Sequence, residues 1–346
     1  MPVVDSFSLA RFTAAVLQAR GLSTADAARV AASLQWADER GIGSHGVAFL
    51  PVYLQMIDAG DSDVRARPRR AHDAPLIIEA GQAAGAVAMA CAMDEALREV
   101  RASGTTTLWV RRLTHAGAMG QYVELAARQG CLAMLFVAGP PLMAYHGAAT
   151  AAATTGPLAM AVPGPDGEPV VFDMAVSEIS FARLRRARVR GEVLPLAAAL
   201  DADGAVTTDA ARAVTPLPMA GAKGSGMALL FELIASLAVA NPVVEPHLRA
   251  ATPADRRHTQ NAMILLARVD AFPSGADFVE RVRSLREMIE GLPRARGVER
   301  IHLPGDRRRA TQQARATQGI AIDPAAWQTL GAIGQAAGVE LPPIRP

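Results

Sequence analysis

The sequence contains few cysteines, few aromatic residues and almost no excess of charge. Of its 346 residues, two are cysteine and 4% are aromatic, and the formal net charge is +2. Neither Cys91 nor Cys131 has a partner at CxxC spacing, which argues against a metal site or a thiol redox motif. The low net charge gives no general attraction for nucleic acid or for a membrane surface.

Long apolar runs are absent as well. No apolar stretch reaches the roughly 20 residues that a membrane-spanning helix needs. Asp5 and the polar residues around it interrupt any apolar segment of the kind that opens a signal peptide. We therefore expect a cytoplasmic protein whose partners include neither a membrane nor nucleic acid.

The sequence does contain an alternation of helical and strand patterns, and its length predicts two domains. The stretch 61–75 is rich in Arg, Asp and Pro and marks a candidate boundary. Residues 227–240 are apolar on every side, which predicts a buried core helix. Helices are expected at 8–20, 24–40, 48–58, 85–100, 122–129, 227–240, 278–290 and 324–337. Strands are expected at 76–79, 105–110, 132–137, 158–162, 170–172 and 262–269. Together they predict an α/β fold with a mixed sheet.

The most informative motif follows the second predicted helix, where Ser44 and His45 stand among three glycines. Histidine can give and take a proton near neutral pH, and glycine lets the backbone approach a ligand closely. We predict that His45 is a general acid; the alternative is a helix-end histidine that bonds a carbonyl group. The glycines also match G-x-G-x-x-G, but a helix rather than a strand precedes them. A Rossmann dinucleotide site is therefore not predicted here.

Three other positions are candidates for chemistry. His115 lies between a predicted strand and a predicted helix, where α/β proteins build ligand sites, and the alternative is a loop histidine that caps the helix. Lys223 and Gly224 begin an apolar helix and suit a phosphate, or form a flexible turn. Asp173 ends a predicted strand and either orients a histidine, bonds a ribose hydroxyl or caps the next turn. A Ser-His-Asp hydrolase is not favoured, because G-x-S-x-G is absent.

Taken in order, these stretches resemble the malate/L-lactate dehydrogenase family that lacks a Rossmann domain. The resemblance extends over nearly the whole chain. It rests on Arg40–Val47, His115–Gly117, Asp173–Ser177, Leu200–Gly204 with Thr207–Asp209, Ala222–Gly226 and Leu303–Asp306.

The resemblance implies a mixed-sheet, non-Rossmann nicotinamide-binding domain over residues 76–309. It implies a helical substrate and dimerisation domain formed by the chain ends, 1–75 plus 310–346, and a homodimer. By the same resemblance, NADH or NADPH is the cofactor and a small molecule is the substrate. His45 is then the proton donor or acceptor supported by Ser44, and His115 is a second catalytic histidine. The implied cofactor contacts are Asp173, Met174, Ala175, Ser177, Lys223, Gly224, Gly305 and Asp306, and Asp173 is also implied to orient His45.

The sequence departs from the family pattern where a substrate is expected. The family has arginine four residues after the histidine, where it holds the substrate carboxylate, and this chain has Phe49. Phenylalanine cannot replace that bidentate, charge-assisted contact. The Thr-Asn-Pro of the family is Thr155-Gly156-Pro157 here, which assigns Phe49, Thr155 and Gly156 to an altered substrate pocket.

Two hypotheses follow from the departures. The first is an NAD(P)H-dependent oxidoreductase that acts on a C=O or C=N bond of something other than a simple 2-oxo acid. The second is a redox-inactive family member that serves as a binding or structural homodimer. The retained Ser44, His45, His115 and Lys223 favour the enzyme. Arg307–Arg309 offer charge for the 2′-phosphate of NADPH or form a solvated face, with the second favoured, so the sequence does not choose between the two cofactors.

Overall fold

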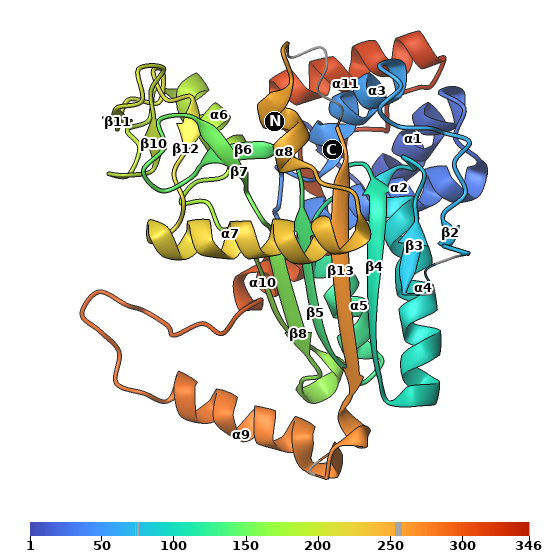
Figure 1. Ribbon diagram of the computed structural model, residues 1–346, viewed down its shortest axis with the longest axis vertical. Coiled ribbons are helices and arrows are strands. Elements are labelled where there is room, and N and C mark those ends of the chain that lie inside the picture. The colour runs from blue at the N-terminus through green and yellow to red at the C-terminus, as the bar shows by residue number, and fades with distance from the viewer. Residues whose placement is uncertain (73, 75, 253–257, 274, 346) are drawn as a thin grey trace.

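The computed structural model describes residues 1–72, 74, 76–252, 258–273 and 275–345. One end of the molecule is a helical cap that both ends of the chain build together (Figure 1). Its first part comprises α1 (Ser6–Ala19), α2 (Thr24–Glu39), a short 3-10 helix η1 (Val47–Phe49) and α3 (Leu50–Asp58). Its second part is α11 (Pro324–Ala337), which packs against α1 and α3. The short strands β1 (Val3–Val4) and β14 (Ile320–Ala321) pair antiparallel and join the two parts.

The body of the molecule is a seven-stranded mixed sheet in the order β2-β3-β4-β13-β5-β8-β9. The pair β3–β4 is parallel, whereas the other neighbours run antiparallel. This arrangement confirms the predicted α/β fold with a mixed sheet. The strands are β2 (Arg69–Arg70), β3 (Ile77–Glu79), β4 (Thr105–Leu113), β5 (Cys131–Ala138), β8 (Leu158–Val162), β9 (Val170–Met174) and β13 (Gln260–Arg268).

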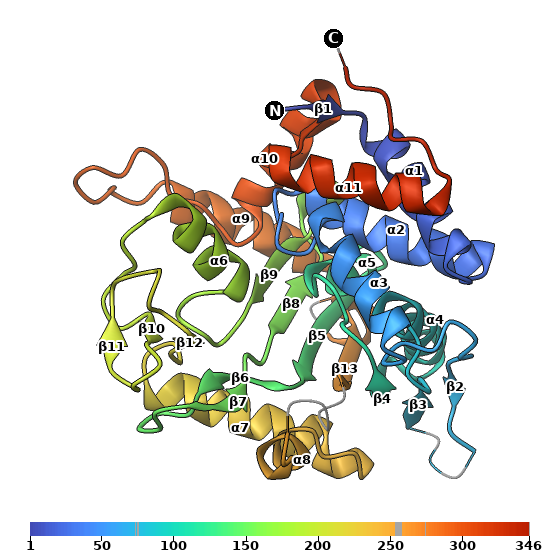
Figure 2. The same ribbon diagram turned by 90° about the horizontal axis from the view of Figure 1, so that it is seen from above.

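Helices cover both faces of this sheet (Figures 1 and 2). The helices α4 (Gly85–Ser103) and α5 (Gly120–Arg128) pack on one face, and α7 (Ala222–Ala235) crosses the other. The central strands therefore bury side chains on both sides, which is why β5 reads as a continuous apolar run.

The helix α7 differs from its prediction in position and in burial. It begins at Ala222 and ends at Ala235, earlier than the predicted range 227–240, and a 3-10 turn η3 (Leu237–Val239) follows. The prediction of a buried core helix is wrong, because Leu229, Leu230 and Leu237 are each more than two-fifths exposed. Residues 222–239 have the length and apolar composition of a membrane span, a property that helices covering a sheet share.

Several polar or short elements were not predicted. A lobe on one side of the sheet has its own small core and contains α6 (Phe181–Arg190) and a three-stranded sheet (Figure 2). The helix α10 (Asp306–Gln318), which was not predicted, contacts α2. The helix α9 (Phe278–Glu290) was predicted with these bounds, and it lies beyond the sheet end farthest from the cap (Figure 1). The other elements are β6 (Pro141–Ala144), β7 (Ala151–Thr154), β10 (Ala199–Leu200), β11 (Val206–Thr207), β12 (Thr215–Pro216), α8 (Val244–Arg249), η2 (Pro165–Gly167), η5 (Val269–Ala271) and η6 (Gly275–Asp277).

The helix α10 also corrects the interpretation of Arg307–Arg309 as a solvated face. Arg308 forms an ion pair with Asp173, and Arg309 forms one with Asp306. Both guanidinium groups are about two-thirds buried, at 34% and 29% exposure. Two of the three arginines therefore hold α10 in place rather than face solvent.

Candidate active site

The Ser44–His45 turn is held against the end of α2 by a buried carboxylate. The helix ends at Glu39, and Gly41 then adopts a left-handed conformation with φ +74°. Asp38 Oδ2 accepts a hydrogen bond of 2.7 Å from the backbone N–H of Val47, nine residues further on. Burial raises the pKa of Asp38 to about 7, although the Val47 N–H and Arg315 act in the opposite direction. The turn that carries His45 is thus closed from behind by Asp38.

His45 is oriented by its neighbour in the sequence. The Oγ atom of Ser44 lies 2.7 Å from His45 Nδ1, which leaves Nε2 as the ring nitrogen available to a ligand. Burial lowers the pKa of His45, the charge of Asp173 raises it and the charge of Arg308 lowers it again. The imidazole is therefore mainly neutral at pH 7, and two named charges set how readily it takes a proton.

His115 lies beside His45 in the loop between β4 and α5. The two imidazole centroids are 5.4 Å apart with the rings 24° from parallel. Phe49 stacks on His115 at 4.5 Å, and Tyr53 Oη lies 3.1 Å from His115 Nδ1. Burial, followed by the charges of His45 and His258, holds the pKa of His115 well below its usual range. A proton on one histidine disfavours a proton on the other, so the pair carries at most one charge near neutral pH.

Asp173 stands near the end of β9 and joins three parts of the fold. Its Oδ2 accepts a hydrogen bond of 2.9 Å from the backbone N–H of Gly120, at the start of α5. Arg308 of α10 approaches the carboxylate to 3.4 Å and also donates to the Asp173 carbonyl at 2.9 Å. Both side-chain contacts are to Oδ2, and within the described residues Asp173 makes no hydrogen bond to His45, so its influence on His45 is electrostatic.

The predicted cofactor segment after Asp173 runs against the N-terminus of α7. The backbone N–H of Met219 donates to the Val176 carbonyl at 2.8 Å. A Cβ on Gly224 would lie 2.5 Å from the Met219 carbonyl oxygen, so only glycine permits this contact. Lys223 is exposed in the first turn of α7, where free N–H groups favour an anion.

Ser177 supplies an independent sign that this segment receives a ligand. Its Oγ is buried and has no hydrogen-bond partner among the described residues. Buried hydroxyl groups almost always have a partner, so the missing one is expected from outside the chain. An unpaired hydroxyl beside a helix N-terminus that carries an exposed lysine fits the ribose and phosphate groups of a nicotinamide dinucleotide.

The remaining predicted residues fall into two groups. The carbonyl of Thr155 accepts from the Val176 N–H at 2.9 Å, and a Cβ on Gly156 would meet Phe231 and Val176, so both lie beside the cofactor segment. Gly305 begins α10 with φ +92° and approaches the Val171 backbone. Its neighbour Asp306 is bonded by the Leu303 N–H, Arg286 and Arg309. The Asp306 carboxylate therefore stabilises the start of α10 in addition to any contact with a ligand.

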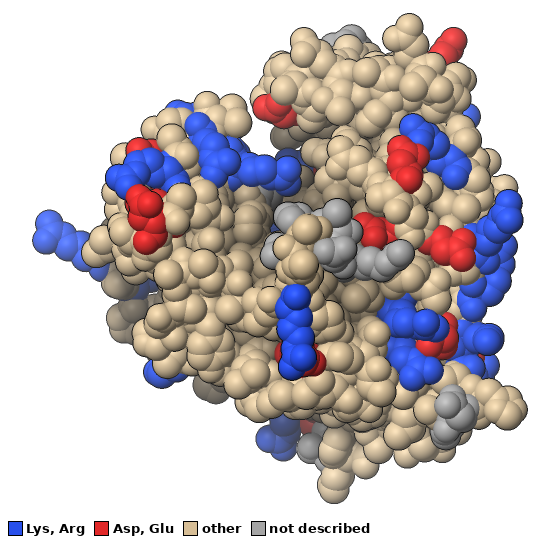
Figure 3. Space-filling view, turned by 45° about the horizontal axis from the view of Figure 1, so that its top comes forward, with Lys and Arg blue, Asp and Glu red and all other residues tan. Residues whose placement is uncertain are grey.

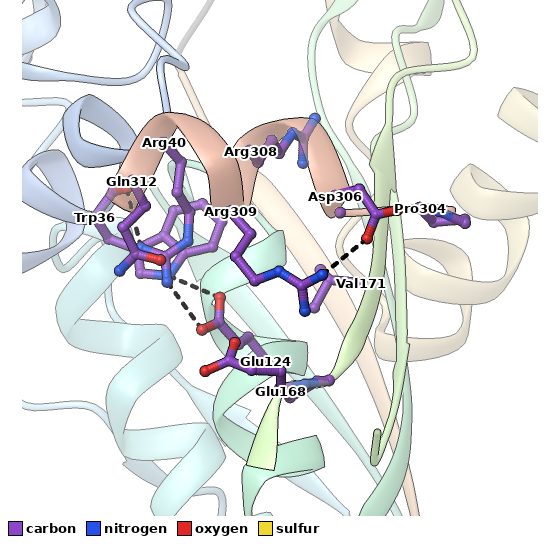
Figure 4. Close-up of a pocket in the computed structure, with 12 residues that line it drawn as sticks. Trp36, Arg40, Glu124, Glu168, Val171, Pro304, Asp306, Arg308, Arg309 and Gln312 are labelled. Carbon is purple, nitrogen blue, oxygen red and sulfur yellow. Dashed lines mark hydrogen bonds and ion pairs between the residues drawn. The ribbon is translucent and has the colours of Figure 1, made fainter. Parts of the chain in front are cut away.

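A pocket behind the site connects α2, α5 and α10 (Figure 4). Arg40 stacks on the Trp36 ring at 4.3 Å and pairs with Glu124 at 2.9 Å, and Trp36 also donates to Glu124. Arg309 and Gln312 face this pocket from α10 (Figure 4). Trp36, Arg40 and Glu124 pair with one another across α2 and α5, so we interpret the pocket as a structural joint between the cap and the sheet.

On the face shown in Figure 3, Lys and Arg side chains gather on the lobe and extend over a hollow between the lobe and the cap. The helix α6 belongs to this lobe and contributes the five arginines Arg183, Arg185, Arg186, Arg188 and Arg190. Its basic character is consistent with an anionic ligand in the hollow.

Four residues near the predicted site were not identified from the sequence, and a fifth, Arg308, was considered only as a contact for the 2′-phosphate of NADPH or as part of a solvated face. Tyr53 and His258 contact or approach His115, and Asp38 holds the turn that carries His45. Arg308 and Arg315 reach Asp173 and the Asp38 backbone from α10. A signal for α10 does exist, since Gly305 and Gly319 bracket a segment free of glycine and proline. The sequence contains no comparable signal for the other three.

Comparisons with known proteins agree with this arrangement. The sequence profile of a family described as malate/L-lactate dehydrogenase matches residues 4–331. A ureidoglycolate dehydrogenase (NAD(+)) of Escherichia coli is 28% identical over 304 residues, which is 87% of each chain. A (2R)-3-sulfolactate dehydrogenase (NADP(+)) of Chromohalobacter salexigens is 33% identical over 224 residues, 64% of this chain and 67% of that one. The solved structure of sulfolactate dehydrogenase from Methanocaldococcus jannaschii superposes with a TM-score of 0.88 at 25% identity, covering 98% of both chains.

Proposed function

Since this chain belongs to the malate/L-lactate dehydrogenase family, we propose that it reduces a C=O or C=N bond, or oxidises the corresponding alcohol or amine, at His45. Membership confirms the expected enzyme class, an NAD(P)-dependent dehydrogenase or reductase, and the expected cofactor, NADH or NADPH. The observation that carries the proposal is the imidazole of His45, bonded to Ser44 through Nδ1 and stacked beside His115.

The reaction needs one hydride and one proton. The nicotinamide supplies or accepts the hydride when it is bound. His45 Nε2 holds the proton, because Ser44 occupies the other ring nitrogen. Reduction uses the imidazolium form of His45, and oxidation uses the neutral form, which the buried surroundings favour.

The remaining residues position these groups. Asp173 supplies the negative charge that stabilises the imidazolium of His45. Burial raises the pKa of Tyr53, so its phenol stays protonated and holds His115 through Nδ1. Lys223, Gly224 and Ser177 are proposed to hold the cofactor. Met174, Ala175 and Gly305 are proposed to line the same binding site.

The proposed substrate class rests on Phe49, which stacks on His115. By the resemblance described above, this position corresponds to the arginine that holds the substrate carboxylate in the family. An aromatic ring favours apolar or planar groups and leaves a carboxylate without its charged partner. We therefore propose a carbonyl or imine of a larger metabolite rather than a simple 2-oxo acid.

The testing experiment is a titration of the purified protein with NADH and with NADPH, followed by nicotinamide fluorescence. Saturable binding of one cofactor at micromolar concentration, together with turnover in a screen of carbonyl and imine substrates, is expected. The Lys223→Gln variant tests the site, and we expect about tenfold weaker binding from the loss of one charged contact. Absence of binding by either cofactor would favour the second hypothesis, a redox-inactive homodimer.

A homodimer is proposed as the assembled form. The exposed face of α7 is proposed as its contact surface, in place of the domain of the chain ends to which the resemblance assigned dimerisation. The surface comprises Leu229, Leu230, Leu233 and Ile234 of α7 and Leu237 of the following turn η3. Contiguous exposed leucine and isoleucine side chains of this kind typically mark a protein interface. Light scattering is expected to give twice the chain mass, and Leu230→Glu is expected to give the monomer. A wild-type monomer would overturn this assignment.

A further inference from the structure

A third histidine lies at the site, and neither the family pattern nor the motifs drew attention to it. His258 lies two residues before β13, which begins at Gln260, and its ring centroid is 6.5 Å from that of His115. Its backbone is fixed on both sides. The N–H approaches Asp61 Oδ1 at 3.4 Å, and the carbonyl accepts from Gln82 Nε2 at 3.2 Å. The position of His258 is therefore set by the fold around it.

The side chain of His258 has an unmet need for a hydrogen bond. Its Nε2 is buried and has no partner among the described residues. Among all the described residues, one other buried side-chain polar atom lacks a hydrogen-bond partner. That atom is Ser177 Oγ in the proposed cofactor segment. One of these atoms lies beside the histidines, and the other lies beside the N-terminus of α7. A buried polar atom is normally paired, so a ligand of the site is the natural partner of each.

The surroundings of His258 decide what kind of group that ligand presents. Burial lowers the pKa of His258 to about 4, with Asp61 acting to raise it and His247 to lower it, so the ring is neutral at pH 7. The neighbouring rings are His115, His45, Phe49 and Tyr53, which form one aromatic cluster. A neutral imidazole among aromatic rings pairs well with an uncharged donor or acceptor and poorly with a carboxylate.

We infer that His258 is a substrate-binding residue whose Nε2 forms a hydrogen bond with an uncharged polar group, a hydroxyl, amide or carbonyl, of the substrate. This inference rests on the proposed function and specifies its substrate class. Phe49 removes the contact to a carboxylate, and His258 supplies a contact to a neutral group in the same cluster. Such a substrate carries its reacting C=O or C=N bond next to an amide, ester or alcohol rather than next to a free acid.

The test uses two small probes that differ in charge and little else. Pyruvamide carries a carbonyl beside a neutral amide, and pyruvate carries the same carbonyl beside a carboxylate. Binding of each probe to the complex of the protein with NADH or NADPH is measured by calorimetry, so turnover is not required. We expect the dissociation constant of pyruvamide to be about tenfold lower than that of pyruvate, or lower still.

Three variants locate the contact. His258→Phe keeps a planar ring without nitrogen and is expected to weaken pyruvamide binding by about tenfold or more, with the cofactor dissociation constant unchanged. His258→Gln places an amide near the position of Nε2 and is expected to restore most of the affinity. His247→Gln is the matched control, because His247 bonds the Val243 carbonyl through Nδ1 and is expected to leave pyruvamide binding unchanged.

Each outcome has a definite meaning. Equal binding of pyruvamide by wild type and His258→Phe would overturn the inference, and so would tighter binding of pyruvate or no binding of pyruvamide. In all three cases intact cofactor binding would leave the proposed function standing. Loss of cofactor binding in the wild type would instead mean that the proposed function itself is wrong.

Discussion

The carboxylate of Asp38 occupies the space in which the side chain of any residue other than glycine at position 46 would begin. A Cβ built on Gly46 would lie 1.8 Å from Asp38 Oδ1 and 2.4 Å from its carboxyl carbon. The same carboxylate accepts the Val47 N–H. The glycine after His45 therefore serves close contact with a buried acid and not a left-handed backbone.

Gly46→Ala is expected to displace either Asp38 or the turn that carries His45. Turnover should then fall by about tenfold or more, since a small misplacement of a proton donor is costly. The dissociation constant of the cofactor should stay the same. Gly43→Ala is the matched control, because a Cβ there meets nothing within 4 Å and its turnover should be normal. Equal kcat values for the two variants would contradict this role of Gly46.

Asp38→Asn is expected to change how stability depends on pH. The folded pKa of Asp38, about 7, lies above its ordinary value of 3.8, so the native state binds the extra proton between these values. Stability of the wild type should therefore fall as pH rises from about 4 to about 7, and then level off. Asparagine keeps an acceptor for the Val47 N–H and removes this titration. The melting temperatures of the wild type and of Asp38→Asn, measured at about pH 5 and about pH 8, check this result. Equal changes in melting temperature between the two pH values in both proteins would contradict it.

His45→Ala is expected to abolish turnover, because it removes the imidazole that is proposed to hold the proton. Cofactor affinity should remain nearly that of the wild type. Ser44→Ala keeps the imidazole and loses the hydrogen bond to Nδ1, so a partial loss of kcat is expected. Stopped-flow reduction with a fluorescence titration separates the two effects. A similar loss of cofactor binding in His45→Ala would show that His45 is structural.

Asp173→Asn and Arg308→Gln are expected to move the pH profile of reduction in opposite directions. The carboxylate of Asp173 raises the pKa of His45, and the guanidinium of Arg308 lowers it. Reduction needs protonated His45, so its rate falls as pH rises through that pKa. Without the carboxylate the falling limb should shift to lower pH, and without the guanidinium it should shift to higher pH. Shifts in the same direction would mean that the pKa of His45 does not determine the pH at which the reduction rate falls.

Phe49→Arg is expected to create activity toward small 2-oxo acids. An arginine at this position can hold a carboxylate by two parallel hydrogen bonds. Rates with pyruvate and with pyruvamide, measured in the variant and in the wild type, give the comparison. Phe49→Leu, which changes the ring without adding charge, is the control. If the arginine variant prefers pyruvamide as strongly as the wild type, Phe49 does not lie at the carboxylate position.

The sequence predicted elements well wherever apolar residues recur at a regular period. The helix α11 has the predicted bounds, and β13 differs from its prediction by two residues or fewer at each end. A periodic apolar face determines both the type of element and its direction of packing. The structure also agrees with the rejection of the G-x-G-x-x-G match as a Rossmann motif, because the helix α2 and not a strand precedes it.

Elements without an apolar period were missed, and they matter to the site. The helix α10 has one buried residue, Asp306, and α6 is rich in arginine. Such helices are held by ion pairs and capping, which hydrophobic periodicity does not register. Arg308 was consequently interpreted as solvated although it pairs with Asp173.

The candidate site was predictable only where its residues are neighbours in the sequence. Ser44 and His45 are adjacent, so their hydrogen bond was open to local reasoning. His258 and His115 come together only through the pairing of β13 with β4. Because His258 and His115 are far apart in the sequence, no local sequence pattern can predict their contact. The catalytic and cofactor roles assigned to these residues stay predictions until the variants are made.

The contact of Arg315 with the Asp38 carbonyl has a consequence for the order in which the protein matures. The two residues are 277 positions apart in the chain, and α11 and β14 complete the core around α1 even later. During synthesis, the segment that carries His45 leaves the ribosome long before the helices that hold it. The helices α1 and α2 cover each other early, whereas the part of α1 that α11 covers stays exposed until α11 is made. Contacts so distant in sequence form slowly. The turn that carries His45 is therefore held in its final position only after the last helices have docked.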